Sequence, residues 1–229
     1  MFGVGESGEL RNLRGMSDLQ IHKMELGPIG TNAFLLWEDG KHDAVLIDIP
    51  PLSKHEIDSV LADKGLKVAQ IWLTHGHWDH IAGAWEYAGE GVEVIGHRAD
   101  EIMFRDPGIM SGFSVPGMEL KPVTITRWVE DGDEMELWGR KVKVLHCPGH
   151  CPGNVLFYFK QQNFAITGDA IFAGSIGRTD LPGGDFPTLE KAIREQIYTL
   201  PDSTRLLPGH GPQTSVAQEK GSNPFVRPA

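Results

Sequence analysis

The segment THGHWDH, residues 74–80, holds three histidines and one aspartate within seven positions, directly after a short apolar run. Imidazole nitrogens and carboxylate oxygens are the ligands that proteins use for zinc, iron and manganese. His75 and His77 alternate at the end of an expected strand, so both can turn to one cation. Asp79 and His80 begin the next helix and can face a second cation. A catalytic metal keeps an open coordination position, so a two-metal site needs further donors from elsewhere in the chain.

Three more candidate donors follow apolar runs farther along the chain. His150 stands in HCPGHCPGN, Asp169 in AITGDAIF and His210 in LLPGHGP, and each lies just beyond an expected strand. Loops at strand ends converge on one face, where sites are commonly built. We therefore expect the THGHWDH cluster to be one half of a metal site. The residue types do not separate zinc from iron or manganese.

Short strands with few helices between them must position these residues. About nine apolar runs of strand length are bounded by turn residues, namely residues 34–37, 44–49, 71–73, 92–95, 123–129, 142–145, 155–159, 164–167 and 205–207. Residues 188–200 have helical periodicity, and Ser53 with Glu56 predicts a capping box that begins another helix. Two more helices are expected to start near Asp79 and Ala99. Early strands without intervening helices favour mixed sheets covered by helices over a doubly wound parallel sheet.

The composition of the 229 residues is that of a folded globular protein, with 40% hydrophobic and 23% charged residues. The formal net charge of −10 argues against a nucleic-acid partner, because binding a phosphate backbone needs a basic field. No apolar run approaches the roughly 18 residues of a transmembrane helix, and the first residues lack the apolar segment of a secretory signal, so no membrane partner is expected. Cys147 and Cys151 form no disulfide framework, which fits a reduced compartment. We expect a cytoplasmic protein with a disordered extension over residues 1–15 and a single domain over residues 16–229.

The sequence resembles the metallo-β-lactamase superfamily, whose HxHxDH signature stands as HGHWDH at residues 75–80. PGHCPGN at 148–154, GD at 168–169 and PGH at 208–210 follow in the order of the superfamily, and the match runs from about residue 20 to 226. The resemblance implies an α/β (α+β) fold, a four-layer αββα sandwich of two mixed β-sheets with the metals at one edge. It implies two divalent metal ions as cofactors, with zinc expected first and iron or manganese as alternatives. By motif position it assigns to one ion His75, His77 and His150, to the other Asp79, His80 and His210, and between them the bridging ligand Asp169.

Within this superfamily, GSIGRTDLPGGD at 174–185 and the ending PGHGPQT with NPFV look like the short glyoxalase II-like (hydroxyacylglutathione hydrolase-like) hydrolases. This resemblance implies a hydrolase that cleaves a thioester such as S-D-lactoylglutathione. A metal-bound hydroxide would be the nucleophile, with Asp79 orienting it and Asp169 as a second catalytic residue. The expected partner is a small-molecule thioester, a glutathione conjugate among the candidates, and the expected state is a monomer or a small homo-oligomer. Only 19 residues follow His210, so the glutathione contacts of the longer enzymes do not carry over.

Four further residues are candidates for a supporting or substrate-contacting role. Asp48 ends another strand and can hydrogen-bond a ligand histidine. His146 could also reach a metal, but the superfamily pattern favours His150, so we expect His146 to support or pack against the site. Arg178 and Asp180 either form an ion pair that braces their loop or line the substrate entrance.

Three other functions are alternatives at this stage. A persulfide dioxygenase of the same superfamily shares the HxHxDH and GRTD signatures and would use one iron held by His75, His150 and Asp169. A lactonase or β-lactamase would present a different carbonyl to the same hydroxide. A non-catalytic metal-binding protein would use the site structurally, but structural zinc sites are normally closed and rich in thiolates. The GHGP ending and the NPFV tail fit the hydrolase better than the dioxygenase.

Overall fold

The computed structural model describes residues 18–228, and its strands form two six-stranded sheets. Sheet A consists, in spatial order, of β1 (Leu19–Leu26), β2 (Thr31–Glu38), β3 (Asp43–Ile47), β4 (Lys67–Trp72), β5 (Glu93–His97) and β6 (Arg127–Val129). Sheet B consists of β14 (Thr214–Ser215), β13 (Arg205–Pro208), β10 (Phe164–Gly168), β9 (Val155–Phe159), β8 (Arg140–His146) and β7 (Glu134–Leu137). A small hairpin pairs β11 (Ile171–Phe172) with β12 (Ser175–Ile176).

Both sheets are mixed. In sheet A, β1, β2 and β3 are antiparallel neighbours, whereas β3, β4, β5 and β6 run parallel. In sheet B, β10 and β13 run parallel and the other pairs run antiparallel. The carboxyl ends of several strands in each sheet therefore meet at one edge of the molecule, which is where connecting loops can share a site.

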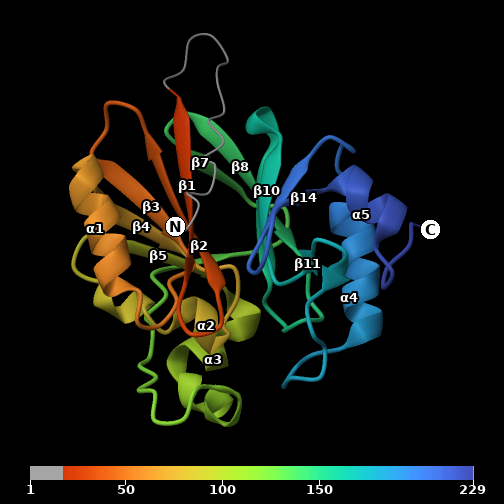
Figure 1. Cartoon of the computed structure of the whole chain (residues 1–229), viewed down its shortest axis with the longest axis horizontal. Helices are drawn as coiled ribbons and strands as arrows, with labels where there is room; N and C mark the ends of the chain where they lie inside the picture. The colour runs from red at the N-terminus through yellow and green to blue at the C-terminus, as the bar shows by residue number, and fades with distance from the viewer. Residues whose placement is uncertain (1–17, 229) are drawn as a thin grey trace, which may run out of the picture.

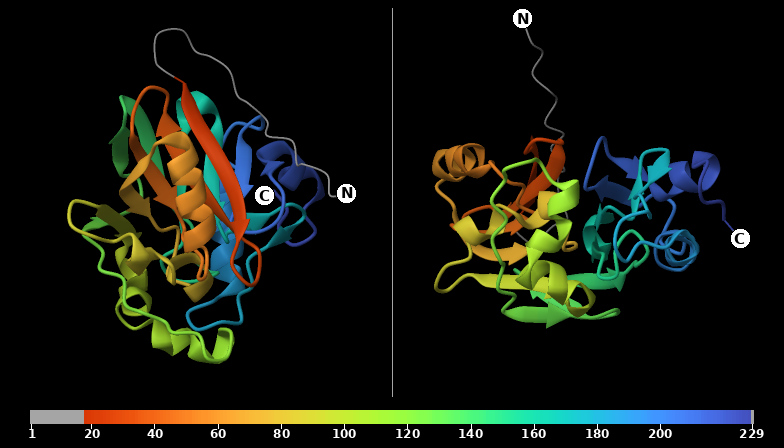
Figure 2. Two further views of the ribbon diagram at one scale, coloured as in Figure 1. Left: turned by 60° about the vertical axis from the view of Figure 1, so that its left-hand side comes forward. Right: turned by 90° about the horizontal axis from the view of Figure 1, so that it is seen from below.

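Helices cover the outer faces of the two sheets. The α-helices are α1 (Lys54–Lys64), α2 (Trp78–Ile81), α3 (Glu101–Arg105), α4 (Phe186–Ala192) and α5 (Val216–Ser222). The 3-10 turns are η1 (Ala84–Glu86), η2 (Arg98–Asp100), η3 (Pro107–Phe113) and η4 (Lys160–Gln162), and η5 (Ile193–Ile197) is a π-helical turn. Buried side chains of α1 and α3 pack on sheet A, and those of α4, η5 and α5 pack on sheet B. Figure 1 shows α1 and α4 on opposite sides of the two sheets, and the view from below in Figure 2 agrees. The four-layer αββα sandwich of two mixed sheets is confirmed.

The largest apolar layer lies between the sheets. Side chains alternate along each strand, so Phe34 and Leu36 of β2 face sheet B while Leu35 between them packs on the helical side. Trp72 of β4 meets Phe157 of β9 across the interface, with ring centroids 5.0 Å apart. Because both faces of each sheet are covered, the central strands are nearly continuous apolar runs, which is why they are visible in the sequence.

Each of the nine predicted runs overlaps a strand, although residues 123–129 form strand only over the last three. The sequence pattern did not indicate β1, β7, β11, β12 and β14, because these strands are short or lie at sheet edges and carry polar side chains. The predicted capping box is wrong: the Ser53 hydroxyl donates to the Pro50 carbonyl at 2.6 Å and makes no cap bond to α1. The other predicted helices are present, and the one near Asp79 is a single turn.

No helix within residues 18–228 is long and apolar enough to cross a membrane. The predicted extension over residues 1–15 lies outside the described residues. The single domain over residues 16–229 and the cytoplasmic location therefore stay predictions.

Candidate metal centre

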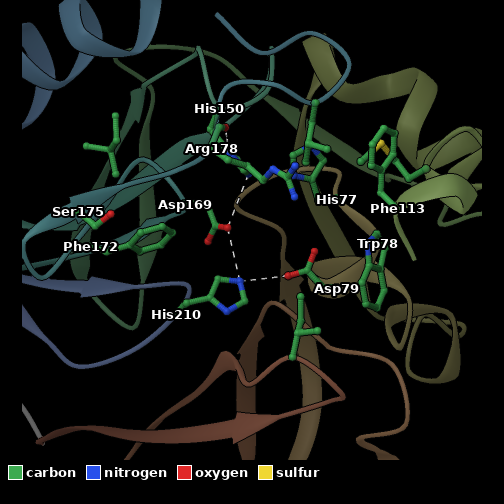
Figure 3. A pocket seen from close by; sticks show the side chains of 14 residues that line it. His77, Trp78, Asp79, Phe113, His150, Asp169, Phe172, Ser175, Arg178 and His210 are labelled. Atoms are coloured by element: carbon green, nitrogen blue, oxygen red, sulfur yellow. Dashed lines mark hydrogen bonds and ion pairs between the residues drawn. The ribbon is translucent and has the colours of Figure 1, made fainter. Parts of the chain in front are cut away.

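The seven predicted donors lie together at one edge of the sandwich. His75 and His77 follow β4, and Asp79 and His80 stand in the one-turn helix α2. Sheet B supplies the other donors from three separate loops, with His150 after β8, Asp169 after β10 and His210 after β13. Figure 3 shows His77, Asp79, His150, Asp169 and His210 around one common space. Six of the seven side chains are buried, and His210 is partly exposed.

The donors form three overlapping groups, and within each group the potential ligand atoms lie within 4.8 Å of one another. The groups are His75, His77 and His150; His75, His80 and Asp169; and Asp79, His80 and His210. The first and third groups coincide with the two sets that the resemblance assigned to two ions. The second group brings Asp169 next to members of both sets.

Three of these histidines are oriented by an oxygen on their Nδ1 atom. These contacts join His75 to Thr74 Oγ1 at 3.0 Å, His80 to Asp48 Oδ2 at 2.7 Å, and His150 to the Arg178 carbonyl at 2.7 Å. The second ring nitrogen, Nε2, is consequently turned toward the common space.

The atoms that face the common space have the properties of metal ligands. The Nε2 atoms of His75, His77, His80 and His150 and the Oδ1 atom of Asp169 are buried and have no hydrogen-bond partner within residues 18–228. Leaving a buried polar atom unpaired costs about 1–3 kcal/mol, so five such atoms at one place require a partner. Imidazole and carboxylate donors of this kind fit divalent cations, and the residues present therefore fit the implied cofactor.

Burial keeps two of the histidines neutral. It lowers the pKa of His75 well below the usual value and, together with the neighbouring His150, lowers the pKa of His77 to about 3. Neutral imidazole is the form that binds a metal, because the coordinating nitrogen must carry a free electron pair. These two side chains therefore need not lose a proton before they can bind a cation.

The pKa of His80 is raised and the pKa of Asp79 is lowered, so both groups favour their charged forms. Burial would lower the pKa of His80, but the carboxylates of Asp79, Asp169 and Asp48 outweigh it and raise the pKa well above the usual value. Burial would raise the pKa of Asp79, yet His80 and a hydrogen bond from His210 hold it well below the usual range. Asp79 and Asp169, whose pKa is likewise lowered, thus stay charged, and the field that favours a proton on His80 also favours a cation in the centre.

Asp48 lies where it can orient the centre, at the end of β3. Its buried carboxylate accepts hydrogen bonds from the Thr74 backbone N–H at 2.8 Å and the Thr74 hydroxyl at 2.7 Å, besides its contact with His80. Its φ of 57° is left-handed, a conformation that aspartate tolerates better than most residues. Asp48 therefore connects the end of β3 to the loop that carries the first four donors.

Asp100 has an equally central position, although no motif marks it and sequence reasoning did not include it. Its buried carboxylate accepts from the backbone N–H of Gly76 at 2.8 Å and of Gly153 at 2.6 Å, and from the Cys151 thiol at 3.2 Å. Burial raises its pKa, and these hydrogen bonds oppose the shift. Gly76 stands between His75 and His77, and Gly153 follows His150, so one carboxylate ties together the donor loops of the two sheets. The available signal was its place just after β5, the parallel neighbour of β4.

The backbone at Gly153 needs a glycine for this contact. A Cβ atom there would lie 2.6 Å from Asp100 Cγ, closer than real Cβ contacts allow. Two asparagines that sequence reasoning also left out complete the bracing. Asn154 Oδ1 accepts from the Asp169 backbone N–H at 3.2 Å, and Asn32 Nδ2 donates to the carbonyls of Pro208 and Gly211 at 2.8 and 2.9 Å.

His146 lies outside the three groups of donors. Its Nε2 atom contacts the Pro152 carbonyl at 2.8 Å, and its ring stacks on His97 with centroids 4.1 Å apart. These contacts are those of a packing residue beside the His150 loop. Cys147 and Cys151 are buried, and burial raises the pKa of both thiols.

Arg178 and Asp180 combine the two roles considered for them. The Arg178 guanidinium donates two hydrogen bonds of 2.7 Å to the Asp180 carboxylate, and both side chains are exposed. Arg178 also lines the cavity above the centre, whereas Asp180 does not. The main chain of Arg178 therefore orients His150 while its side chain faces solvent and the cavity entrance.

A cavity of about 500 Å³ opens over the donors. Its polar lining consists of His77, Asp79, His150, Asp169, Ser175, Arg178 and His210, and its apolar lining of Ile29, Trp78, Met110, Phe113, Phe172, Ile176 and Leu181. Such a space can admit a small molecule to the open side of a metal centre.

An αββα sandwich whose edge gathers five histidines and two aspartates below an open cavity defines a class of metal-dependent enzymes. The model of the metallo-beta-lactamase superfamily matches residues 26–210. The chain therefore belongs to the metallo-beta-lactamase superfamily, a superfamily of metallo-hydrolases.

Known relatives cover most of the chain. The hydroxyacylglutathione hydrolase GloC of Haemophilus influenzae is 36% identical over 199 residues, which are 85% of this chain and 92% of that protein. The crystal structure of the BLEG-1 B3 metallo-beta-lactamase has a TM-score of 0.81 at 31% identity and covers 90% of this chain and 99% of its own. The crystal structure of TTHA1623 in a di-iron-bound form has a TM-score of 0.77 at 33% identity and covers 90% of this chain and 100% of its own.

Proposed function

We propose that this protein is a binuclear metal-dependent hydrolase of small-molecule thioesters. The observation that carries the proposal is the convergence of seven donors, five of which turn a buried nitrogen or oxygen atom without a hydrogen-bond partner among the described residues toward the common space. The similarity to GloC supports a thioester as substrate, and the similarity to the di-iron form of TTHA1623 supports two ions.

The ligand roles follow the two outer groups of donors. His75, His77 and His150 would hold one ion, and Asp79, His80 and His210 would hold the other. Asp169 would bridge them, because its Oδ1 lies 3.4 Å from His80 Nε2 and its Oδ2 lies 3.6 Å from His150 Nε2 and 3.5 Å from His210 Nε2. The donors suit zinc first, and iron or manganese as alternatives.

Held by these residues, two divalent ions would supply a hydroxide nucleophile at neutral pH and would polarise the substrate carbonyl. The protein side chains orient this chemistry. Asp79 Oδ2 is held by the Thr31 hydroxyl at 3.2 Å, and the carboxylate lines the cavity, where it can accept a hydrogen bond from the attacking water. The apolar walls reduce the access of competing water, and the thiolate of the substrate leaves toward the open side of the cavity.

A one-iron persulfide dioxygenase would use His75, His150 and Asp169, and these three donors also lie together in this centre. That assignment leaves Asp79, His80 and His210 without a chemical role. The arrangement therefore favours a two-ion hydrolase. A non-catalytic metal protein is disfavoured by the open cavity above the centre.

A β-lactamase is a second candidate because BLEG-1 is 31% identical over most of both chains. A lactam carbonyl could meet the same nucleophile, and a lactone carbonyl could as well. Parallel assays with a β-lactam and a lactone would rank these activities against thioester hydrolysis on the same metal-loaded sample.

The test is the loss of S-D-lactoylglutathione thioester absorbance without oxygen, with the metal content counted on the same sample. Turnover with close to two ions per chain would support a binuclear thioesterase. No turnover, with about one iron per chain and oxygen uptake on glutathione persulfide, would overturn the proposal in favour of the dioxygenase.

A further inference from the structure

The two walls of the cavity differ in chemistry. One wall comes from the β1–β2 turn, α2 and η3 and consists of the apolar side chains Ile29, Trp78, Met110 and Phe113. The other wall comes from the β11–β12 hairpin and the following segment, and it adds the polar Ser175 and Arg178 to Phe172, Ile176 and Leu181. Figure 3 shows Phe172 and Ser175 on one side of Asp169 and His210, and Trp78 and Phe113 on the other. We call the wall of Ile29, Trp78, Met110 and Phe113 the Phe113 wall.

The solvent exposure of the side chains in the Phe113 wall increases from the interior to the surface. Trp78 and Met110 are buried, whereas Phe113 is 49% exposed and Ile29 is 52% exposed. Neighbouring large apolar side chains that stay exposed at a cavity mouth mark a surface that a ligand covers. Apart from the donor Asp79 of α2, the side chains that line this wall are apolar, so the group that the wall would cover is itself apolar.

Cations are scarce around the cavity. Within the described part of the chain, Arg178 is the one lysine or arginine that lines it, and its guanidinium already makes two hydrogen bonds to Asp180. Lys23 lies beside the His210 loop, where its Nζ donates to the Gly211 carbonyl, but it does not line the cavity. Glutathione carries two carboxylates, so this lining offers too few free cations to bind both.

We propose that the site selects thioesters with a bulky apolar acyl group, aromatic or branched, that packs on the Phe113 wall, and with a thiol part that needs no carboxylates. The thiol part lies on the opposite side, because Arg178 there can donate a hydrogen bond to an amide carbonyl of a neutral carrier and the Ser175 hydroxyl can donate to or accept from its amide groups. This inference rests on the proposed function, since it names the substrate class of the same centre.

The activity test compares acyl groups on one uncharged carrier. With the metal-loaded protein, kcat/KM for the phenylacetyl thioester of N-acetylcysteamine should exceed that of the lactoyl thioester at least tenfold, as burial of an aromatic ring implies. Phe113→Ala should lower this ratio about tenfold. Phe225→Ala is the matched control, because Phe225 is 51% exposed but does not line the cavity, and it should leave the ratio unchanged.

A ratio near one in the wild type, or an equal loss on both substrates in Phe113→Ala, would overturn the inference. The carrier is tested with S-D-lactoylglutathione against the lactoyl thioester of N-acetylcysteamine. A preference for the glutathione carrier of tenfold or more would contradict the proposed neutral thiol part.

A binding measurement separates this inference from the proposed function. The probe is the non-hydrolysable thioether analogue of the phenylacetyl substrate, titrated calorimetrically. We expect Phe113→Ala to raise Kd about tenfold and Phe225→Ala to leave it unchanged; equal Kd values in wild type and Phe113→Ala would overturn the inference. If a protein with two ions hydrolyses no thioester, the proposed function fails, and the calorimetry alone decides whether the wall binds an apolar group.

Discussion

The two halves of the metal centre are built differently. Sheet A supplies four donors from one segment, residues 74–80, whereas sheet B supplies His150, Asp169 and His210 from three loops. Donors within one segment keep their spacing through local geometry. Donors on separate loops keep their relative positions only when the strands of sheet B pair in the correct register. The second half therefore depends more on contacts between residues far apart in the chain.

The braces of the two halves differ in the same way. Buried carboxylates hold the sheet A segment. Asp48 contacts Thr74 and His80, and Asp100 contacts Gly76. Main-chain and amide groups hold the sheet B loops, as the Arg178 carbonyl, Asn154 and Asn32 do. Asp100 also bonds Gly153 and so belongs to both halves. A compact donor motif therefore still needs an acceptor from elsewhere in the chain to align it with the other donors.

Removing a donor should have the largest effect. We expect His77→Ala and Asp169→Ala to lower thioester hydrolysis by at least about 10³-fold, since each removes a ligand of the reacting centre, while the fold is retained. His77→Ala should keep close to one ion per chain, whereas Asp169→Ala should weaken both ions because Asp169 lies between the two sets. Turnover, metal analysis and circular dichroism check this. Wild-type turnover of either variant at matched metal content would show that the two-metal mechanism is wrong.

Removing the shared brace should come next. Asp100→Ala leaves the buried N–H groups of Gly76 and Gly153 without an acceptor, which costs about 1–3 kcal/mol of stability for each group. Metal affinity should fall about 10- to 100-fold for both ions, as is usual when a ligand-orienting group is lost. Urea unfolding and metal release to a chelator measure the two effects. Asp100→Asn keeps one acceptor oxygen and should recover part of the stability and part of the metal affinity. Unchanged metal release in Asp100→Ala would show that Asp100 does not support the metal centre.

A brace of one half should act on one ion. Asn32→Ala removes the hydrogen bonds to the Pro208 and Gly211 carbonyls that hold the His210 loop. We expect about tenfold weaker retention of the ion that we assign to Asp79, His80 and His210, with the other ion little changed. Stepwise metal removal followed by metal counting distinguishes the two. Equal weakening of both ions would show that the halves are not independently braced.

The smallest effect is expected for Asp180→Ala. A hydrogen bond from Arg178 lowers the pKa of this exposed carboxyl to about 2, so the pair contributes stability above the ordinary carboxyl pKa and loses it as the pH falls toward 2. Exposed pairs contribute little, so the melting temperature at pH 7 should change by less than about 2 °C. Thermal unfolding at pH 7 and near pH 2 measures the difference, which should shrink at the lower pH. A loss of metal in this variant would mean that the pair positions His150.

Much of the architecture could be predicted because local patterns determine it. The covered strands are continuous apolar runs, and four donors stand within residues 74–80. Edge strands such as β1 and β7 were missed because one-sided exposure allows polar residues in them. The Ser53 cap was predicted from a pattern that another local contact overrides, since the Ser53 hydroxyl donates to the carbonyl of Pro50, three residues earlier.

Local patterns in the sequence predicted mixed sheets covered by helices and the seven candidate donors, because apolar runs and the donors that follow them are local properties, whereas the four-layer sandwich was implied by the resemblance to the superfamily. Asp100 and Asn32 emerged as braces of the donor loops only from the tertiary structure, because neither stands in a motif and both bond main-chain groups at distant positions. The tertiary structure also decided that Ile29, Trp78 and Phe113 share one wall of the cavity. The physical reason is that a brace or a wall is a contact between segments remote in the chain, and packing of the two sheets selects which segments meet.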